Sequence, residues 1–295
     1  MAEAGDLVLS DVHRDVVATR VVKNVTTSRF PFQFPDQTAV DYDDDGDAIV
    51  YRREQCLFLI EHAMATPFSD VGQQVWHGAL LLADLLLNMK DRLGEIVVLE
   101  LGGGVGLATL AAALHAKTVI CTDIGDDLLE MCCRNVDNNL AALGDLVQAS
   151  VLVRKLDWLE PTPPQDGNNK WSQQDLTLLS HTNIIMAADV IYDDDITDAF
   201  FSCLTYLYSD VFTTQSPLVY VALEKRINFT LEHLAAVSPA HQHFMQCITR
   251  HHMTQHGSSI KFTANQIPLQ NITHCFNYDR SDHMEVWELR ITKCS

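Results

Sequence analysis

A glycine-rich stretch contains the first residues whose types and spacing could do chemistry. Residues 97–113 read VVLELGGGVGLATLAAA. After Glu100, a glycine stands at every second position, giving Gly102, Gly104 and Gly106. Glycine allows a sharp backbone turn and lets a ligand approach the backbone closely. At the end of a buried strand, this pattern predicts a ligand-binding turn that leads into a helix.

The spacing of these glycines excludes two kinds of phosphate-binding loop. A Walker loop requires Gly-Lys-Ser/Thr at its end, and no such sequence follows here. The dinucleotide fingerprint G-x-G-x-x-G would need its third glycine at position 107, which is Leu107. We therefore expect a ligand that lacks a pyrophosphate.

Further polar and aromatic residues follow at the ends of the next two predicted strands. Asp123 could accept hydrogen bonds from two ribose hydroxyls, although it could also cap the following helix. Asp157 could accept from an adenine amino group and Trp158 could pack beside the ring, although Trp158 could also belong to the core. Glu100 would favour a cationic tail on the ligand. Together these residues predict S-adenosylmethionine as the cofactor.

The elements that position these residues alternate between strand and helix. Short apolar runs rich in β-branched residues predict buried strands, and apolar residues at helical spacing predict helices. Strands are expected at 56–62, 95–101, 117–123, 147–157, 183–189, 218–226 and 284–292. Helices are expected at 72–89, with Asp70 as a possible cap, and at 106–116, 125–140 and 197–212. This alternation predicts an α/β protein with a parallel sheet.

The first part of the chain differs in composition from the rest. It contains prolines, polar residues and an acidic cluster at 41–47. Such a composition is typical of a solvated, poorly ordered tail. We therefore expect an acidic, disordered tail at 1–50, which could be deleted without affecting the ligand site, and a catalytic domain at 51–295.

Charge and hydropathy restrict the partners of the protein. The 295 residues carry a formal net charge of −19, which opposes direct binding of nucleic acid. No apolar run is long enough to span a membrane, and the N-terminus does not resemble a signal peptide. Eight cysteines without a C-x-x-C pair indicate reduced thiols in an intracellular protein. No metal site is predicted, because the histidines at 241–256 lack a Cys or acidic ligand at suitable spacing.

The chain resembles the seven-stranded methyltransferases that act on protein lysines. The matching pieces include HAMATPFSDVGQQVWHGALLLADLL, LELGGGVGLATL, CTDIGDDLLEMCCRN, LDWL and AADVIYDDDITDAFF, and they cover about residues 60–235 in order. The resemblance implies a Rossmann-like, seven-stranded class I methyltransferase sheet flanked by helices. It assigns to the cofactor the residues named above, and it places Trp76 beside the cofactor as well.

The predicted fourth strand of the sheet ends in a second motif. Asp189 and Tyr192 form D-x-x-Y, which resembles the active-site motif of this group. Enzymes that methylate base amino groups usually carry [DNS]-P-P-[YFW] there, but no proline lies between Thr182 and Thr214. Asp189 could orient an incoming amine, and the ring of Tyr192 could face a cationic or methylated amine. The three aspartates that follow, at 193–195, are expected to cap the next helix.

The sequence thus predicts a protein-lysine N-methyltransferase that uses S-adenosylmethionine. Two alternatives stay open: a methyltransferase for a small molecule or another protein side chain, and an inactive binding module that keeps the fold. The resemblance implies a basic, nuclear, nucleic-acid-binding protein as substrate, with chaperones as candidate partners. It also implies a location in the nucleus and cytoplasm.

Overall fold

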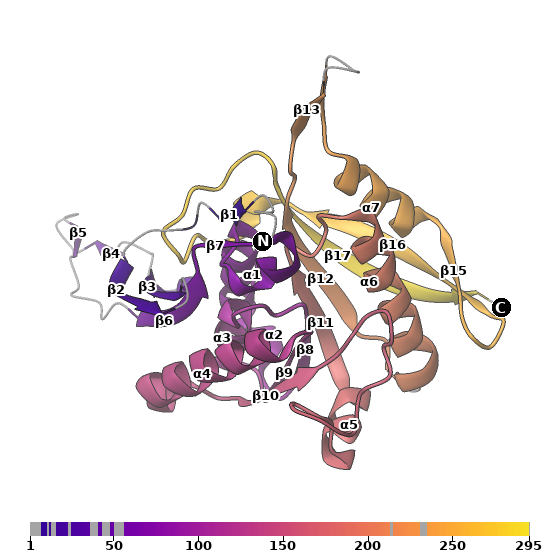
Figure 1. Cartoon of the computed structure of the whole chain (residues 1–295), viewed down its shortest axis with the longest axis horizontal. Helices are drawn as coiled ribbons and strands as arrows, with labels where there is room; N and C mark the ends of the chain where they lie inside the picture. The colour runs from indigo at the N-terminus through magenta and orange to yellow at the C-terminus, as the bar shows by residue number, and fades with distance from the viewer. Residues whose placement is uncertain are drawn as a thin grey trace, which may run out of the picture.

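The structure is a computed structural model. It describes residues 7–10, 12, 16–22, 25–35, 41–42, 48–49, 56–212, 215–230 and 235–294. A large central sheet with helices on both faces forms the body of the protein (Figure 1). In the described part of the chain, no helix combines the length and apolarity that crossing a membrane would require.

The central sheet has eight strands in the order β10-β9-β8-β11-β12-β17-β16-β15. The first five are parallel: β10 (Ser150–Lys155), β9 (Thr118–Asp123), β8 (Val97–Leu101), β11 (Thr182–Ala188) and β12 (Leu218–Glu224). The others follow with antiparallel neighbours: β17 (Met284–Cys294), β16 (Ser259–Ile267) and β15 (His251–Met253). The strand order reverses direction at β8, as in a Rossmann-like sheet. The predicted class I methyltransferase fold is therefore confirmed, with β15 as an additional edge strand.

In the described ranges, six helices cover the two faces of the sheet. One face carries α1 (His77–Asn88), α3 (Leu107–Ala113) and α4 (Asp126–Leu143), and the other carries α5 (Gln173–Ser180), α6 (Asp194–Tyr206) and α7 (Pro239–Thr249). The short α2 (Lys90–Leu93) follows α1. The strands point alternate side chains into the two cores, because successive strand residues face opposite sides. Val98 packs with the α1 side and Leu99 with the α6 side.

Helix α1 begins later than the sequence predicted. The predicted helix at 72–89 is interrupted, because a 3₁₀ helix at Phe68–Gln73 is followed by extended residues before His77. Asp70 lies inside this 3₁₀ helix with non-helical torsions, so the prediction that it caps α1 is wrong. The residue before α1 is Trp76, whose side chain makes no cap hydrogen bond. The acceptor at this helix end comes from a distant residue, Asp189.

The N-terminal part of the chain contributes a strand to the packed domain. Residues Val25–Phe32 form β3, which pairs over its length with β6 (Cys56–Ala63), and β3 also pairs with β2 (Val16–Val22). Phe30 and Phe32 are buried in the same core as α1. The prediction of a disordered tail is therefore wrong for residues 25–35. The acidic residues at 43–47 lie outside the described residues.

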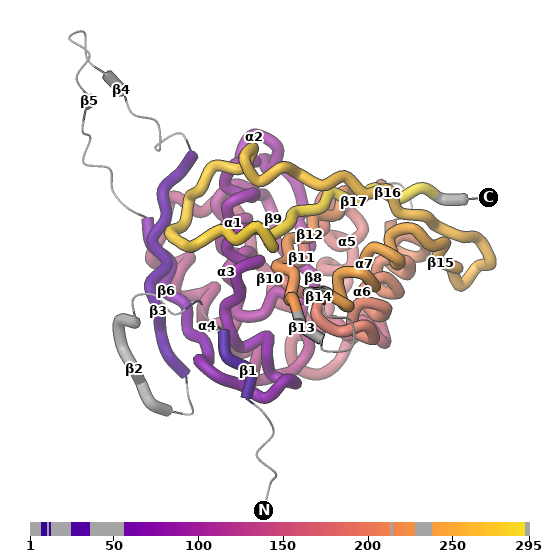
Figure 2. The backbone as a smooth tube through the Cα atoms, turned by 90° about the horizontal axis from the view of Figure 1, so that it is seen from above, coloured from indigo at the N-terminus to yellow at the C-terminus, as the bar shows by residue number. Residues whose placement is uncertain are grey.

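The predicted strand at 56–62 exists as β6, but it lies outside the central sheet. It packs beside α4, where Asn139 and Asn135 bond the backbone of Leu59 and Glu61. The remaining strands of the described residues form three short pairs: β1 (Val8–Leu9) with β7 (Ala65–Thr66), β4 (Asp41–Tyr42) with β5 (Ala48–Ile49), and β13 (Asn228–Thr230) with β14 (Ala235–Val237). Figure 2 shows the segment between β16 and β17 crossing α1 toward β3. Main-chain contacts join it to β3, including an antiparallel bridge from Phe32 to Phe276.

Candidate active site

A cleft opens at the carboxyl ends of the parallel strands, where ligands bind in sheets of this kind. Nine of the ten residues predicted as site residues line it: Trp76, Glu100, Gly102, Gly104, Asp123, Asp157, Trp158, Asp189 and Tyr192. The tenth, Gly106, lies beneath the cleft as the residue that precedes α3. Further lining residues that the sequence did not single out include Ser69, Gln74, Ile124 and Leu159. The assigned roles in binding and catalysis stay predictions.

The glycine turn forms the floor of the cleft between β8 and α3. Gly102, Gly104 and Gly106 have positive φ angles of 72°, 54° and 90°, a region that favours glycine. The backbone N–H of Gly104 donates to Oδ2 of Asp123 over 2.8 Å. A Cβ atom on Gly104 would lie 2.9 Å from the carbonyl oxygen of Gly72. A side chain at position 104 would therefore press on the backbone of Gly72, which also lines the cleft.

Asp123 follows directly from β9 and presents its carboxylate to the cleft. Its Oδ1 accepts from the N–H of Ile124 over 2.7 Å, in addition to the bond from Gly104. Burial raises the pKa of Asp123 to about 6, although both backbone bonds favour the ionised form. Each oxygen has two acceptor sites, so the carboxylate can still accept hydroxyl donors from a ligand.

Glu100, at the end of β8, is 1% exposed and lies under the glycine turn. The hydroxyl of Thr109 on α3 donates to its Oε2. Burial raises the pKa of Glu100 to about 8, and the nearby Asp123 adds to this shift. At neutral pH the carboxyl is therefore mainly protonated, and a cation in the cleft would favour its ionised form.

Asp157 and Trp158 form the opposite wall, just after β10. The N–H of Leu159 donates to Oδ1 of Asp157 over 2.9 Å, which fixes the carboxylate of Asp157 in a local turn. The ring of Trp158 meets Phe200 of α6 in a T-shaped contact, with centroids 5.5 Å apart. Trp158 therefore has a structural contact with α6 as well as a position in the cleft.

Asp189 lines the cleft and connects three elements of the fold. It follows β11 with a positive φ of 52°, an uncommon torsion for a residue other than glycine. Its Oδ2 accepts from the N–H of Gly78 in the first turn of α1 over 2.5 Å, and its Oδ1 accepts from the N–H of Glu224 over 2.9 Å. A Cβ on Gly78 would lie 2.5 Å from the same carboxylate, so the close approach requires glycine there. Burial raises the pKa of Asp189. This carboxylate therefore links the end of β11 to α1 and β12, in addition to any contact that it makes with a substrate.

Aromatic rings and one arginine also line the cleft. Trp76 donates its indole N–H to the carbonyl oxygen of Val71 over 2.9 Å. The ring of Tyr192 meets Phe68 in a T-shaped contact. From the sequence, neither Glu224 nor Arg226 could be assigned to a substrate channel. Arg226 lines the cleft, whereas Glu224 faces another hollow, where it bonds His77 and Ser281.

The aspartates after Tyr192 include the predicted helix cap. Oδ1 of Asp193 accepts from the N–H groups of Asp195 and Ile196, at 3.0 and 3.1 Å. Asp194 and Asp195 occupy the first turn of α6, where their negative charges interact favourably with the helix dipole. The prediction that this acidic run begins a helix is therefore confirmed.

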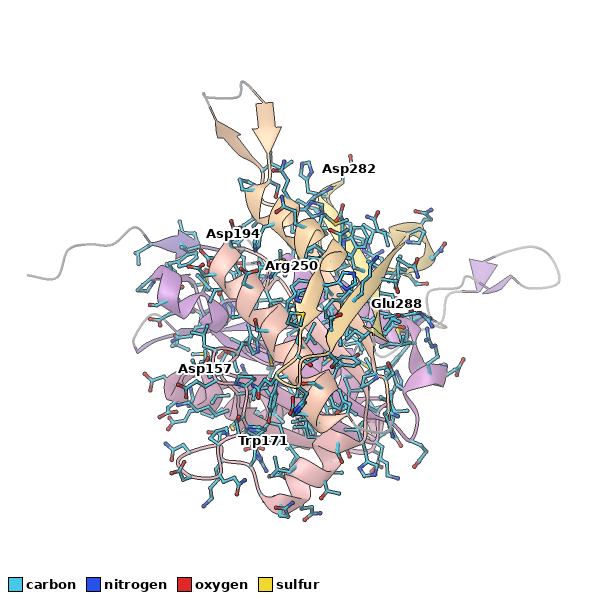
Figure 3. The ribbon with its side chains drawn as sticks, turned by 90° about the vertical axis from the view of Figure 1, so that its right-hand side faces the viewer. Asp157, Trp171, Asp194, Arg250, Asp282 and Glu288 are labelled. Carbon is cyan, nitrogen blue, oxygen red and sulfur yellow. The ribbon has the colours of Figure 1, made fainter. Side chains whose placement is uncertain are left out.

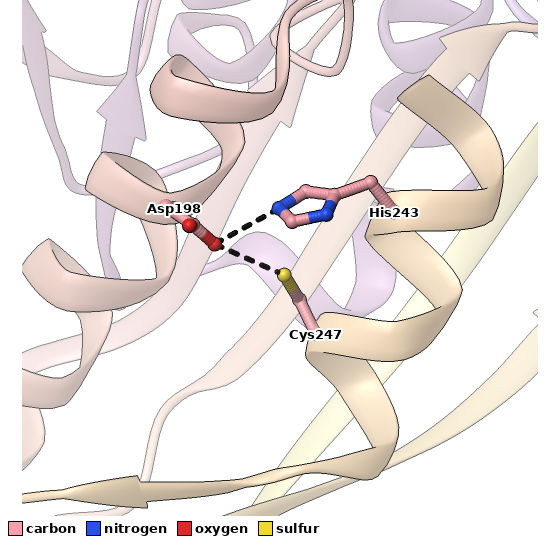
Figure 4. A group of neighbouring side chains, drawn as sticks. All are labelled: Asp198, His243 and Cys247. Carbon is pink, nitrogen blue, oxygen red and sulfur yellow. Dashed lines mark hydrogen bonds and ion pairs between the residues drawn. The ribbon is translucent and has the colours of Figure 1, made fainter. Parts of the chain in front are cut away.

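A histidine from the region at 241–256 meets possible metal ligands that sequence spacing did not reveal. His243 and Cys247 lie one turn apart on α7, and both face Asp198 on α6 (Figure 4). Asp198 Oδ1 lies 2.9 Å from His243 Nε2 and 3.4 Å from Cys247 Sγ. The guanidinium of Arg250 lies 2.6 Å from the same oxygen. Since a cation already neutralises Asp198, this group is explained as a hydrogen-bonded contact between helices.

Comparisons with known proteins point to one family. A family model described as lysine methyltransferase matches residues 60–251. Methyltransferase-like protein 22 of Homo sapiens is 41% identical over 238 residues, covering 79% of this chain and 57% of that protein. Its counterpart from Mus musculus is 40% identical over 238 residues, covering 79% and 59%. Protein-lysine N-methyltransferase rrg1 of Schizosaccharomyces pombe is 34% identical over 130 residues, covering 43% and 39%. The chain thus spans less than two thirds of the length of these relatives.

Proposed function

This chain belongs to the lysine methyltransferase family, and from that premise we propose that it transfers a methyl group to a lysine side chain of a protein. One observation carries the proposal. The cleft joins the glycine turn and carboxylates of a cofactor site to the aromatic rings and Asp189 of the D-x-x-Y motif. The name of the Schizosaccharomyces pombe relative, protein-lysine N-methyltransferase rrg1, supports a protein as the substrate.

The predicted cofactor, S-adenosylmethionine, is confirmed by membership of this methyltransferase family. The residues of the cleft fit it. Glu100, Asp123 and Asp157 supply carboxyl groups, the glycine turn leaves backbone room, and Arg226 is the sole lysine or arginine among the described lining residues. Such a lining suits a positively charged ligand and opposes a pyrophosphate. When bound, the cofactor supplies an activated methyl group on a sulfonium.

The reaction needs a neutral lysine amine. With an ordinary pKa of about 10.4, a lysine is neutral in roughly one of 10³ molecules at pH 7. Burial of the amine and a nearby positive charge both lower this pKa. Asp189 and Tyr192 are the residues that we propose contact the amine: Asp189 accepts a hydrogen bond and orients it, and Tyr192 offers its ring. Orientation of this kind supplies much of the rate of a displacement.

We further propose the class of protein that is methylated. The net charge of −19 favours a basic partner over nucleic acid itself. Exposed apolar side chains near the cleft, including Phe68, Ile124 and Leu159, offer contact area for a polypeptide. These features support a basic protein as substrate, and the proposal that it is a nuclear, nucleic-acid-binding protein rests on the family resemblance. A location in the nucleus and cytoplasm and an association with chaperones are proposed on the family resemblance alone.

The test is transfer of labelled methyl groups from S-adenosylmethionine to cell-extract proteins, followed by mapping of the modified residue. Tyr192→Ala should lose most of the transfer and keep S-adenosylhomocysteine affinity, because it leaves the glycine turn and the carboxylates assigned to the cofactor unchanged. Tyr192→Phe should lose little if the ring matters more than the hydroxyl. Asp189 is the less informative target, since its removal also frees the N–H groups of Gly78 and Glu224.

The mapped product decides between the candidate functions. A methylated lysine that disappears with Tyr192→Ala supports the proposal. A label on a small molecule or on another side chain overturns the lysine assignment. Cofactor binding without transfer to any component of the extracts, from nuclear and cytoplasmic fractions alike, favours a binding module.

A further inference from the structure

Two aromatic rings in the cleft surround a cation that belongs to the protein itself. The guanidinium carbon of Arg226 lies 4.7 Å from the ring centroid of Trp76 and 5.8 Å from that of Tyr192. Phe68 packs against Tyr192 with centroids 5.5 Å apart. A cation within about 6 Å of an aromatic face is attracted by the ring. Trp76 and Tyr192 therefore form a cation-binding pair, and Arg226 occupies it.

Arg226 is held differently from other arginines of the chain. Ion pairs with carboxylates hold Arg134, Arg154, Arg250, Arg280 and Arg290. Figure 3 labels Glu288, the partner of Arg290 on β17, and Arg250, which directly follows α7. Arg226 has no hydrogen bond or ion pair with any described residue, although the chain is strongly acidic. It is also exposed, and the rings and the nearby charge of Asp189 attract it without a direct bond, so it can move into water.

The position of this pair suits a substrate. Trp76, Tyr192 and Arg226 line the same cleft as Asp189, so a chain entering there reaches the rings and the carboxylate together. Alkylammonium groups bind aromatic faces by the same attraction as guanidinium groups, and methylated ammonium groups are a recognised ligand of aromatic cages. Because Arg226 is exposed, its guanidinium can leave the rings for water, and an alkylammonium group that enters the cleft can take its place.

We propose that Trp76 and Tyr192 are the receptor for the alkylammonium group of the substrate and its methylated product, and that Arg226 fills this receptor until it is displaced. The identity of that group as lysine rests on the proposed function. The proposal that the two rings bind a cation and that Arg226 occupies them does not depend on the proposed function, because it can be tested without cofactor or turnover.

The test uses choline as the probe and its neutral isostere 3,3-dimethylbutan-1-ol as the control ligand. Binding to the full chain is followed by NMR of the indole N–H of Trp76 at fixed ionic strength. We expect choline to shift this signal and the isostere to have little effect. Arg226→Gln should tighten choline binding by about two- to fivefold, the factor expected for removal of an exposed cation–π competitor. Arg226→Lys keeps a competing cation and should bind choline as the wild type does.

Two further variants distinguish the contribution of the rings to choline binding from the effect of the net charge of the protein. Tyr192→Leu should weaken choline binding in the Arg226→Gln background, because one ring is lost. Arg290→Gln removes the same charge at a distance and should leave choline affinity unchanged. Equal binding of choline and its isostere, no binding of either, or no change with Arg226→Gln would overturn the proposal. Choline binding that behaves as expected in a chain that methylates no lysine would instead contradict the proposed function alone.

Discussion

Two regions of the molecule contain buried carboxyl groups. In one region an arginine pairs with the carboxylate, and in the other the carboxyl groups have no cationic partner among the described residues. The first, here called the anchor region, comprises Phe32 of β3, Asp84 of α1 and residues 273–280. Asp84 is fully buried, and its oxygens accept from the N–H groups of Cys275 and Phe276 and from the hydroxyl of Tyr278. The guanidinium of Arg280 lies 2.5 Å from its Oδ2. Every partner of this carboxylate thus comes from a segment that it fastens to α1.

The second region is the cleft, where no cation of the chain neutralises Glu100 or Asp123 among the described residues. Thr109 bonds Glu100, and backbone N–H groups bond Asp123. Burial raises the pKa of Asp84, Glu100 and Asp123, but only at Asp84 does a paired arginine oppose the shift. The comparison teaches that the anchor region contributes stability, whereas the cleft keeps acidic groups available for a ligand.

Removal of residues 1–35 is the strongest test of the anchor region. This deletion takes away Phe30 and Phe32, and it uncovers Phe58 and Phe276, whose ring centroids lie 4.6 and 5.2 Å from that of Phe32. Loss of one buried phenylalanine costs about 3–5 kcal/mol, so loss of two approaches the total stability of a domain. We expect the truncated chain to lose cooperative thermal unfolding by circular dichroism.

A point variant on the same strand provides the control. Arg29 is exposed on β3, so Arg29→Ala should leave the melting temperature nearly unchanged, while Phe32→Ala should lower it strongly. A truncated chain that melts as the full chain does would show that β3 is dispensable, as the composition of residues 1–50 suggested.

Asp84→Ala should have the next largest effect. It leaves the charge of Arg280 and two N–H groups without their acceptor, and breaking a buried pair in this way costs about 3–5 kcal/mol. Urea unfolding would measure the loss. Arg290→Gln, which breaks the more exposed pair with Glu288, should cost at most about 1 kcal/mol. Similar losses in both variants would mean that the anchor region is no more than a surface ion pair.

The cleft could be predicted from the sequence because its residues follow local patterns. Glu100, Asp123, Asp157 and Asp189 each stand at the end of an apolar strand, and parallel strands bring their carboxyl ends to one edge. Strand and helix periodicity therefore placed the carboxylates together without any knowledge of contacts. The same logic found six of the eight strands of the central sheet.

The anchor region could not be predicted, because its contacts join segments far apart in the chain. Phe32 meets Phe276, and Asp84 meets Arg280, so neither has a local signal. The polar composition of residues 1–50 concealed the alternating buried pattern of β3. No sequence motif assigns a role to Arg226, and only the structure shows that its guanidinium lies over Trp76 and Tyr192.

Gly104→Val tests whether the cleft is shaped for a ligand. Valine is strained at a φ of 54°, and its Cβ would approach the carbonyl oxygen of Gly72 to 2.9 Å. We expect S-adenosylhomocysteine affinity to fall by about 10²-fold, or roughly 2.7 kcal/mol, in calorimetry. Gly94→Val is the matched control, because a Cβ there meets no atom within 4 Å. Undiminished affinity in Gly104→Val would show that the ligand binds away from this turn.

The smallest expected effect concerns the proton on Glu100. Its pKa is about 8 in the folded chain and 4.5 as the ordinary value, so the folded state holds a proton that the unfolded state releases between these pH values. The stability from this proton is fully present below pH 4.5 and is lost as pH rises through 8. At up to 1.36 kcal/mol per pH unit, the wild type should lose about 1.5 kcal/mol between pH 6.5 and 8 from this group.

Glu100→Gln isolates that contribution, because glutamine resembles the neutral acid at all pH values. In urea unfolding without ligand, the free energy of unfolding of the variant should not show the decrease of about 1.5 kcal/mol between pH 6.5 and 8. Asp123 and the histidines whose pKa values are lowered by burial, His252 and His274, titrate in both chains and cancel in the difference. Parallel stability profiles for the two chains would mean that Glu100 is ionised in the free protein. A cation of the chain would then have to neutralise it, and the contrast between the cleft and the anchor region would disappear.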